Sequence, residues 1–251
     1  MRTLSLFFLC FCLHTTNVYT QEISADKPPE RLIIEMYADG GHNQTYSGFS
    51  QLSPNIIVNA GQKTRLQLGS NFLFSNNAHK TFNAFGFSIQ HQIFEKEHKK
   101  LSASAGHLHI LPTENFRDNY YFVRLEYTTL RWKFQLGNNR RETKLSKYAL
   151  ENQVFTGDNT KITDNRNFIY HLGWWIKPID NQWNIQIAAT NFDRYLLDIE
   201  TNPSFIVLGE YKTGKKINYF VQLNFRTAGS MNLAANYYSI LIRGGVTWNV
   251  L

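Results

Sequence analysis

The chain has 251 residues, a formal net charge of +7 and a mean hydropathy of −0.36. This length suffices for one large β domain. The basic excess is not gathered into a Lys/Arg run of the kind that forms a nucleic-acid arm, so we expect no nucleic-acid partner. Both cysteines, Cys10 and Cys12, lie in an apolar segment near the N-terminus, which leaves the rest of the chain without a thiol for disulfides, zinc or nucleophilic catalysis.

The first thirty residues read as a targeting segment and a short leader. Arg2 precedes an apolar run from Leu4 to Leu13, and polar or small residues follow before position 21. This pattern is typical of a secretory signal peptide, which we predict over 1–20, with a polar leader over 21–30. The apolar run is too short to cross a hydrocarbon core of about 30 Å.

From residue 31 onward the sequence breaks into amphipathic runs separated by turn residues. We predict that 31–251 forms a closed antiparallel transmembrane β-barrel of about twelve strands, each near the length that a tilted membrane-spanning strand needs. The expected strands cover 31–39, 51–59, 64–75, 82–94, 101–111, 120–128, 130–138, 167–177, 183–192, 204–212, 215–228 and 236–250.

The connections between these runs alternate between short and long. Short ones follow the even-numbered strands, at 60–63, 95–100, 129, 177–182 and 213–214. Longer ones follow most odd-numbered strands, at 40–50, 76–81, 112–119, 139–166, 193–203 and 229–235. This asymmetry is typical of barrels with tight turns on one side of a membrane and loops on the other.

The final strand shows the alternation most clearly. Ile240, Ile242 and Trp248 fall on one face, whereas Arg243 and Thr247 fall on the other. A closed barrel must pair this strand with its first strand, because no unpaired backbone can face lipid. A hairpin of a soluble β-sandwich could imitate one such pattern, but the repetition along the chain favours the barrel.

Aromatic residues support the same assignment. Trp and Tyr favour the headgroup zone of a membrane and collect at strand ends. The residues near the short turns or the C-terminus that we expect in such a girdle are Tyr127, Trp132, Trp174, Trp183, Tyr211 and Trp248.

Together these features resemble the outer-membrane β-barrel proteins of Gram-negative bacteria. The Asn-, Lys- and Phe-rich texture, with Gln21 at the expected mature start, is similar to members from Bacteroidota. The resemblance implies location in the outer membrane, contact with its lipid and lipopolysaccharide, and a leader on the periplasmic side. The terminal strand resembles the signal read by the outer-membrane assembly machinery, although the chain ends on Leu251 rather than on an aromatic residue.

The charged residues of the inner faces suggest a function. A basic, water-filled lumen concentrates anions, so we predict a passive channel, or porin, for small anionic solutes. The expected lumen-lining residues are Arg65, Arg124, Glu126, Arg131, Lys133, His171, Glu210, Arg226 and Arg243.

An alternative is that these side chains form a hydrogen-bonded ladder that fills a closed interior. About twelve strands lie between the eight that leave room only for side chains and the sixteen that leave an open channel. The aromatic residues expected to point inward and narrow the lumen are Phe94, Phe122, Trp175 and Phe220.

The longest expected loop, 139–166, carries the cations Arg140, Arg141, Lys144 and Lys147. It could fold into the pore as a constriction, or project outward to bind polysaccharide or the phosphates of a surface glycolipid. An ordinary solvated loop is the alternative, although loops of this length often have a function.

Two other classes of function are a lipid-modifying hydrolase and an accessory subunit of an envelope complex. A lipid-modifying hydrolase needs a serine activated by histidine, but the His-Ser-Asn-Gly element of the outer-membrane phospholipases is absent, and His91 and Ser88 lie on opposite faces. His107 and His109 share a face without a third ligand, so we expect no metal and no cofactor. An accessory subunit of a secretion or uptake complex is the remaining alternative. Because the hydrolase element is absent, we favour a function that is not enzymatic.

Overall fold

The computed structural model describes residues 31–250, except 44–46, 75–81, 111–114, 153–160, 178–181, 193–202, 214–215 and 228–236. The predicted signal peptide and leader, 1–30, lie outside the described residues. Within the described residues, no helix is long and apolar enough to cross a bilayer, a finding that does not bear on strands.

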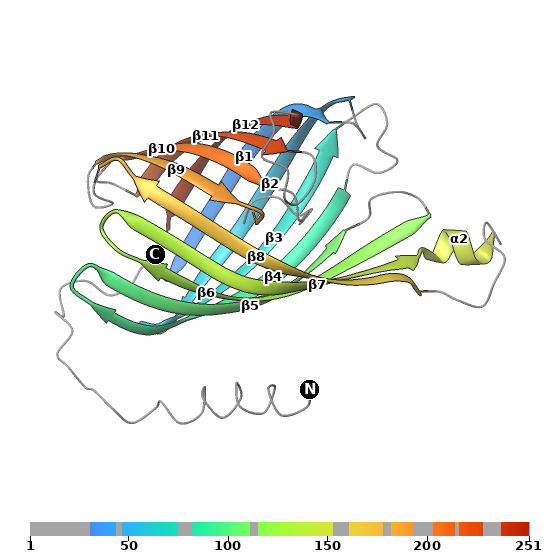
Figure 1. Cartoon of the computed structure of the whole chain (residues 1–251), viewed down its shortest axis with the longest axis horizontal. Coiled ribbons are helices and arrows are strands. Elements are labelled where there is room, and N and C mark those ends of the chain that lie inside the picture. Colours follow the sequence, from blue (N-terminus) through green and yellow to red (C-terminus); the bar gives the residue numbers. More distant parts are fainter. Residues whose placement is uncertain are drawn as a thin grey trace.

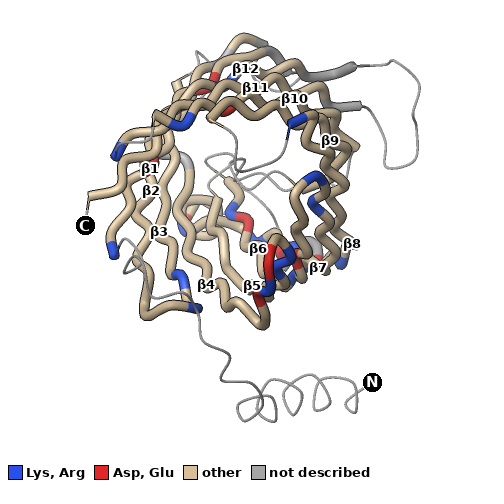
Figure 2. The backbone as a smooth tube through the Cα atoms, turned by 90° about the vertical axis from the view of Figure 1, so that its left-hand side faces the viewer, with Lys and Arg blue, Asp and Glu red and all other residues tan. Residues whose placement is uncertain are grey.

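The described residues form a closed barrel of twelve antiparallel strands, as predicted. Each strand pairs with its neighbours in sequence, and the first pairs with the last, so the ladder has no open edge (Figures 1 and 2). The strands are β1 (Leu32–Asn43), β2 (Ser47–Ala60), β3 (Thr64–Phe74), β4 (Phe82–Lys96), β5 (Lys99–Ile110), β6 (Phe116–Thr128), β7 (Trp132–Leu145), β8 (Lys161–Trp175), β9 (Trp183–Thr190), β10 (Ser204–Lys212), β11 (Ile217–Thr227) and β12 (Tyr237–Asn249); the helix α2 (Lys147–Glu151) follows β7.

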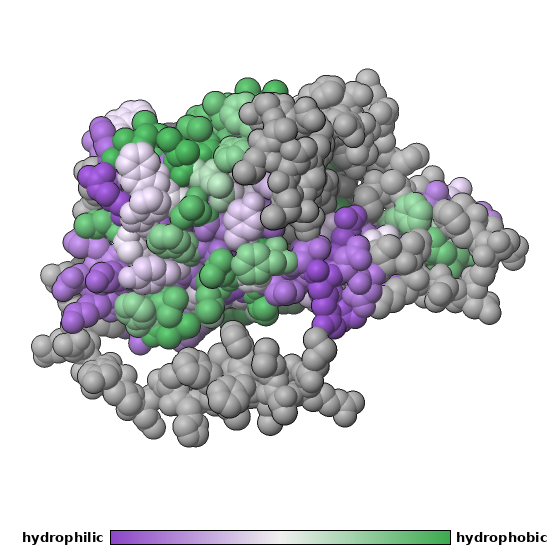
Figure 3. Space-filling model, in the orientation of Figure 1, coloured by the Kyte–Doolittle hydropathy of each residue, from purple (hydrophilic) through white to green (hydrophobic). Residues whose placement is uncertain are grey.

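The outer wall of the barrel is apolar. Alternate side chains of a strand point to opposite faces, and the outward ones here are large and exposed, such as Leu68 and Val221, each 58% exposed. Figure 3 shows such apolar side chains gathered on the wall, with more polar surface on either side. A contiguous apolar surface of this kind is rare on soluble proteins and marks contact with lipid or a partner.

The two ends of the barrel differ. We call the end with the short connections (61–63, 97–98, 129–131, 176–182 and 213–216) the turn end, and the opposite end the loop end. Local chemistry explains the tight turns: Gly61 has a φ of +79°, and the Thr129 hydroxyl accepts a hydrogen bond of 2.9 Å from the backbone N–H of Trp132. β1 begins and β12 ends at the turn end (Figure 1).

β7 and β8 are longer than predicted. Part of the expected loop 139–166 is strand, since β7 continues to Leu145 and β8 begins at Lys161. After β7, Ser146 caps α2 by accepting a hydrogen bond from the N–H of Ala149. The predicted strands end at 138 and begin at 167 because the apolar alternation stops there. Ion pairs between strands take over there, and the hairpin with α2 projects beyond its neighbours (Figure 1).

Candidate functional site: the barrel interior

Most of the predicted lumen-lining residues point inward. The larger interior cavity is lined by Arg65, Glu126, Lys133, His171 and Glu210, among others. Arg124 lines a second, smaller cavity, and Arg243 is fully buried.

Two of the predicted lining residues, Arg131 and Arg226, are not among those that the structure places in the lumen. Arg131 lies in the exposed turn before β7, where its guanidinium donates a hydrogen bond of 2.9 Å to the carbonyl of Ile176 at the mouth of the barrel. It therefore does not line the cavity as expected, because the strand begins only at Trp132. Arg226 belongs to β11, but its side chain lies outside the described residues.

The larger cavity occupies the turn-end half of the lumen and has a volume of about 290 Å³. Its cations are Arg65, Lys100 and Lys133, and its acids are Glu126 and Glu210. The Lys133 ammonium lies 3.3 Å from the Glu126 carboxylate, so part of this charge is paired. The cavity is thus polar, and its three cationic groups exceed its two acids by one.

Two buried donors also face this cavity. The indole Nε1 of Trp175 and the amide Nε2 of Gln186 have no hydrogen-bond partner among the described residues. A buried donor without a partner costs about 1–3 kcal/mol. Such groups are satisfied by water or by the acceptor atoms of a solute, so the cavity wall suits a polar or anionic guest.

Phe192 lines both the larger cavity and a second one of about 40 Å³, whose lining also includes Phe122 and Arg124. We call the cluster of Phe122, Arg124 and Phe192 the septum. The rings of Phe122 and Phe192 lie 5.5 Å apart, and the Arg124 guanidinium lies 4.7 Å from the centre of the Phe192 ring. Phe192 contacts residues of both cavities because it follows the end of β9 and turns into the lumen. The inward position of Phe192 was not predicted from the sequence, because the expected strand 183–192 put Phe192 at its end, in the wall.

Local hydrogen bonds produce this inward turn. The pairing of β8 with β9 ends at Thr190, after which the side chain of Asn191 accepts from the N–H of Tyr170 and donates to the carbonyl of Phe168, each at 2.7 Å. The side-chain amide of Asn191 thus makes hydrogen bonds that a β9 backbone would otherwise make with β8. Phe192, the next residue, lies inside the barrel and packs against Phe122.

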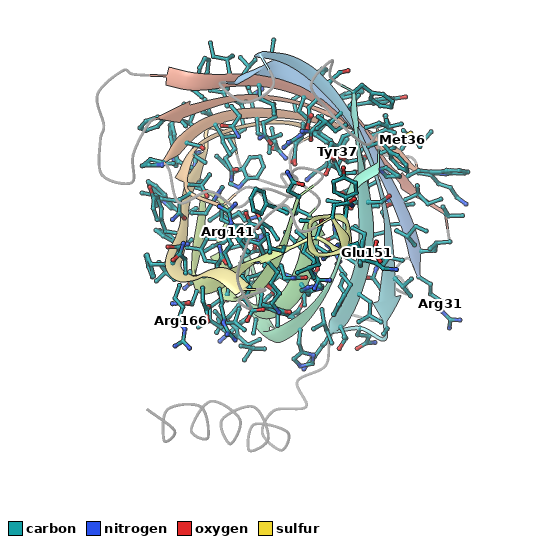
Figure 4. All side chains as sticks on the ribbon, turned by 90° about the vertical axis from the view of Figure 1, so that its right-hand side faces the viewer. Arg31, Met36, Tyr37, Arg141, Glu151 and Arg166 are labelled. Carbon is teal, nitrogen blue, oxygen red and sulfur yellow. The ribbon has the colours of Figure 1, made fainter. Side chains whose placement is uncertain are left out.

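The seam that closes the barrel contains a buried ion pair. Asp39 of β1 and Arg243 of β12 are direct cross-strand partners, and both side chains are 0% exposed. Nε and Nη2 of Arg243 donate to Asp39 at 3.0 and 2.9 Å, and the guanidinium lies 5.0 Å from the ring of Tyr37. Figure 4 shows Tyr37 on the inner side of the wall. This pair contributes no net charge to the lumen, although Arg243 was predicted to do so.

Several acids of the inner face were not included in the predicted site. Glu35 and Asp39 alternate with the inward Tyr37, and Asp118 forms an ion pair of 2.6 Å with Arg141. Alternation along the first strand could have revealed the first two, whereas Asp118 fell in an expected loop. The cations of the described inner face still outnumber its acids; they are Arg65, Lys100, Arg124, Lys133, Arg141, Lys212 and Arg243, against Glu35, Asp39, Glu95, Asp118, Glu126 and Glu210.

The inward aromatic residues are as expected in three of four cases. Phe122, Trp175 and Phe220 are buried inside, but Phe94 is 40% exposed. The expectation for Phe94 was wrong because a bulge between Gln92 and Phe94 shifts the register, so that Phe94 pairs with the outward Leu101.

The six aromatic residues expected in a girdle lie on the outer face at the turn end. The rings of Trp132 and Trp174 are 6.5 Å apart, and those of Trp183 and Tyr211 are 4.2 Å apart. An interfacial girdle requires aromatic side chains on the outer face near the strand ends.

The cations of the expected loop are divided between faces and elements. Arg141 points inward with Asp118, whereas Arg140 and Lys144 lie on the outer face of β7 and Lys147 lies in α2. They do not form one constriction.

The residues considered for catalysis are also dispersed. His107 and His109 lie on the outer face and both contact the side-chain oxygen of Asn119, at 3.3 and 2.9 Å. The Nδ1 of His91 lies 3.0 Å from the Thr64 hydroxyl, and Ser88 faces the interior. Among the described residues, no group of three His, Cys, Asp or Glu side chains could hold a metal ion.

No family model matches the sequence, and no curated protein matches it. An outer-membrane channel from Pseudomonas putida F1 is similar in structure, with a TM-score of 0.53 and 10% identity over 91% of this chain and 99% of that one. The KdgM porin, in complex with disordered oligogalacturonate, has a TM-score of 0.51 and 8% identity over 87% and 99%. Outer-membrane phospholipase A from Escherichia coli has a TM-score of 0.43 and 8% identity over 93% and 95%.

The two likenesses above a TM-score of 0.5 show the fold. This chain has the closed antiparallel barrel found in outer-membrane channels. The expected Bacteroidota origin stays a prediction.

Proposed function

We propose that this protein is a passive channel of a Gram-negative outer membrane that admits small solutes with a mild preference for anions. The observation that carries the proposal is the polar cavity of about 290 Å³ inside a closed barrel whose outer wall is apolar. An interior of this kind has no structural need for unpaired donors and excess cations, whereas a solute pathway does.

The membrane location rests on the wall. A closed ladder pairs the backbone of each strand with its neighbours, and exposed side chains such as Leu68 and Phe168 match a hydrocarbon environment. The short connections and the aromatic girdle at the turn end favour an orientation in which that end faces the periplasm. The fold shared with outer-membrane channels supports the same assignment.

The preference for anions rests on the cavity lining. Arg65, Lys100 and Lys133 outnumber Glu126 and Glu210, and cationic groups in a narrow lumen raise the local concentration of anions. Because Lys133 is paired with Glu126, we expect the selectivity to be weak. The septum lies across the path beyond the cavity, so we also expect a small conductance.

Planar-bilayer recordings of the purified protein under a KCl gradient test the proposal. The wild type should conduct and give a reversal potential of the anion-selective sign, and Arg65→Glu combined with Lys133→Glu should reverse that sign. The matched control is Lys99→Glu, which changes an exposed cation at the start of β5 that does not line the cavity. Absence of conductance would refute the channel, and an unchanged reversal potential in the double variant would refute the anion preference.

A further inference from the structure

Three nitrogen-bearing side chains gather on the inner face where β8 lies beside β9 (Figure 2). They are those of His171, Trp175 and Gln186, and all three line the larger cavity. Trp175 and Gln186 are direct cross-strand partners, so their side chains stand side by side on the inner face. Nitrogen groups of two neighbouring strands thus face the same part of the cavity.

Gly173 allows two of these nitrogens to converge. It lies between His171 and Trp175 on the inner face of β8. A Cβ atom on this glycine would lie 2.7 Å from Nε2 of Gln186 and 2.8 Å from Nε2 of His171, so both nitrogens lie within a hydrogen-bond length of one point. A glycine inside a strand weakens the strand and often marks a place that another group approaches closely. Here the missing side chain leaves room for the two nitrogens.

Two of the donors lack an acceptor. Trp175 and Gln186 are only 4% and 3% exposed, and within the described part of the chain neither the indole Nε1 nor the amide Nε2 has a hydrogen-bond partner. An acceptor in the adjoining cavity would remove this penalty. Lys133 adds a positive charge, since it is the direct cross-strand partner of Gly173 and also lines the cavity. We call Lys133, His171, Gly173, Trp175 and Gln186 the donor cluster.

The charge around the donor cluster suits a single anionic group. Glu126 lies 3.3 Å from Lys133, and Glu210 is the cross-strand partner of Asn184. The cations that line the cavity exceed these two acids by one, so one negative charge balances the lining and two would reverse its sign. A carboxylate carries one charge and accepts hydrogen bonds through two oxygens, which suits neighbouring N–H donors.

An apolar surface adjoins the donor cluster on the side of β10. Leu208 is the cross-strand partner of Gln186, and Ile206 is that of Ala188. Leu208 and Ile206 line the cavity together with Phe192. A solute held at the donor cluster can therefore lay a hydrocarbon body on these side chains. Pockets for drug-sized ligands measure roughly 300–1,000 Å³, so a cavity of about 290 Å³ suits a smaller molecule.

We propose that the donor cluster binds the carboxylate of a small organic monocarboxylate whose apolar body packs against Ile206, Leu208 and Phe192. The indole and amide N–H groups donate to the carboxylate oxygens, and Lys133 supplies the positive charge. This inference rests on the proposed function, because it names the class of anion that the channel admits.

The test is isothermal titration calorimetry of the purified full chain in detergent, with pentanoate as the probe. The wild type should bind pentanoate at one site. Gln186→Met keeps the length of the side chain but removes its donor, so it should raise the Kd at least tenfold. Trp175→Phe keeps an aromatic ring and should raise the Kd at least threefold. The matched control is Gln67→Met, the same exchange on β3 at the smaller cavity, which should leave the Kd unchanged.

Two further probes separate the parts of the solute. Acetate lacks the apolar body and pentan-1-ol lacks the carboxylate, so each should bind at least tenfold more weakly than pentanoate. Three results would overturn the proposal: no saturable binding of pentanoate, an equal loss of affinity in Gln67→Met and Gln186→Met, or equal binding of pentan-1-ol and pentanoate.

Calorimetry and bilayer conductance can fail independently of each other. A protein that binds pentanoate as predicted but does not conduct would refute the channel and retain the binding site. A protein that conducts with an anion-selective reversal potential but does not bind pentanoate would refute the carboxylate site alone.

Discussion

Replacing Asp39 by alanine should destabilise the barrel severely. The substitution removes the carboxylate that the Arg243 guanidinium, 0% exposed, binds at 2.9 and 3.0 Å at the seam between the first and last strands. Removing one partner of a buried ion pair costs about 3–5 kcal/mol, because the remaining charge stays desolvated. We expect a loss of this size in the free energy of unfolding, measured by urea denaturation of the protein in lipid vesicles with tryptophan fluorescence.

Two comparison variants isolate the cause. Glu151→Ala breaks the exposed pair with Lys147 and should cost no more than about 0.5 kcal/mol. Asp39→Leu combined with Arg243→Met removes both charges and should recover most of the loss, since the desolvation penalty disappears with the charge. A loss below about 1 kcal/mol in Asp39→Ala, or a double variant as unstable as the single one, would refute the reasoning.

Two further predictions concern the septum and the β7–β8 hairpin. Phe192→Ala removes a ring that contacts both cavities and Arg124, so single-channel conductance in planar bilayers should rise at least twofold; unchanged conductance would show that the septum does not limit passage. Asp164→Ala removes the bidentate partner of Arg140, whose side chain is 41% exposed, so global stability should fall by less than about 1 kcal/mol while amide hydrogen exchange in 140–145 accelerates. Unchanged protection there would show that the ion pairs do not hold the extension of the strands.

The alternation of apolar and polar residues made the strands of the barrel wall predictable from the sequence. A strand between lipid and a polar interior must change polarity at every residue, and the twelve predicted strands overlap those of the structure because this pattern is local. It also placed Arg65, Glu126, Lys133 and His171 on the inner face, where they line the cavity.

The predictions from sequence were wrong where the local alternation of residues and the pairing between strands disagree. The bulge before Phe94 reverses its face, and only the register with β5 reveals it. β7 extends past the apolar zone because Arg140 finds Asp164 on the neighbouring strand, a contact between residues far apart in sequence. The secondary-structure propensities of Arg140 and Asp164 do not predict such a pairing.

The amino-acid sequence by itself determined the kind of wall this protein builds, since the period-two change between apolar and polar residues leaves a closed amphipathic barrel as the consistent solution. Only the tertiary structure decided which interior charges cancel and which remain, and that Phe192 divides the lumen. The physical reason is that charge pairing and occlusion depend on contacts between residues far apart in the chain, such as Asp39 and Arg243, which become neighbours only when the first and last strands pair.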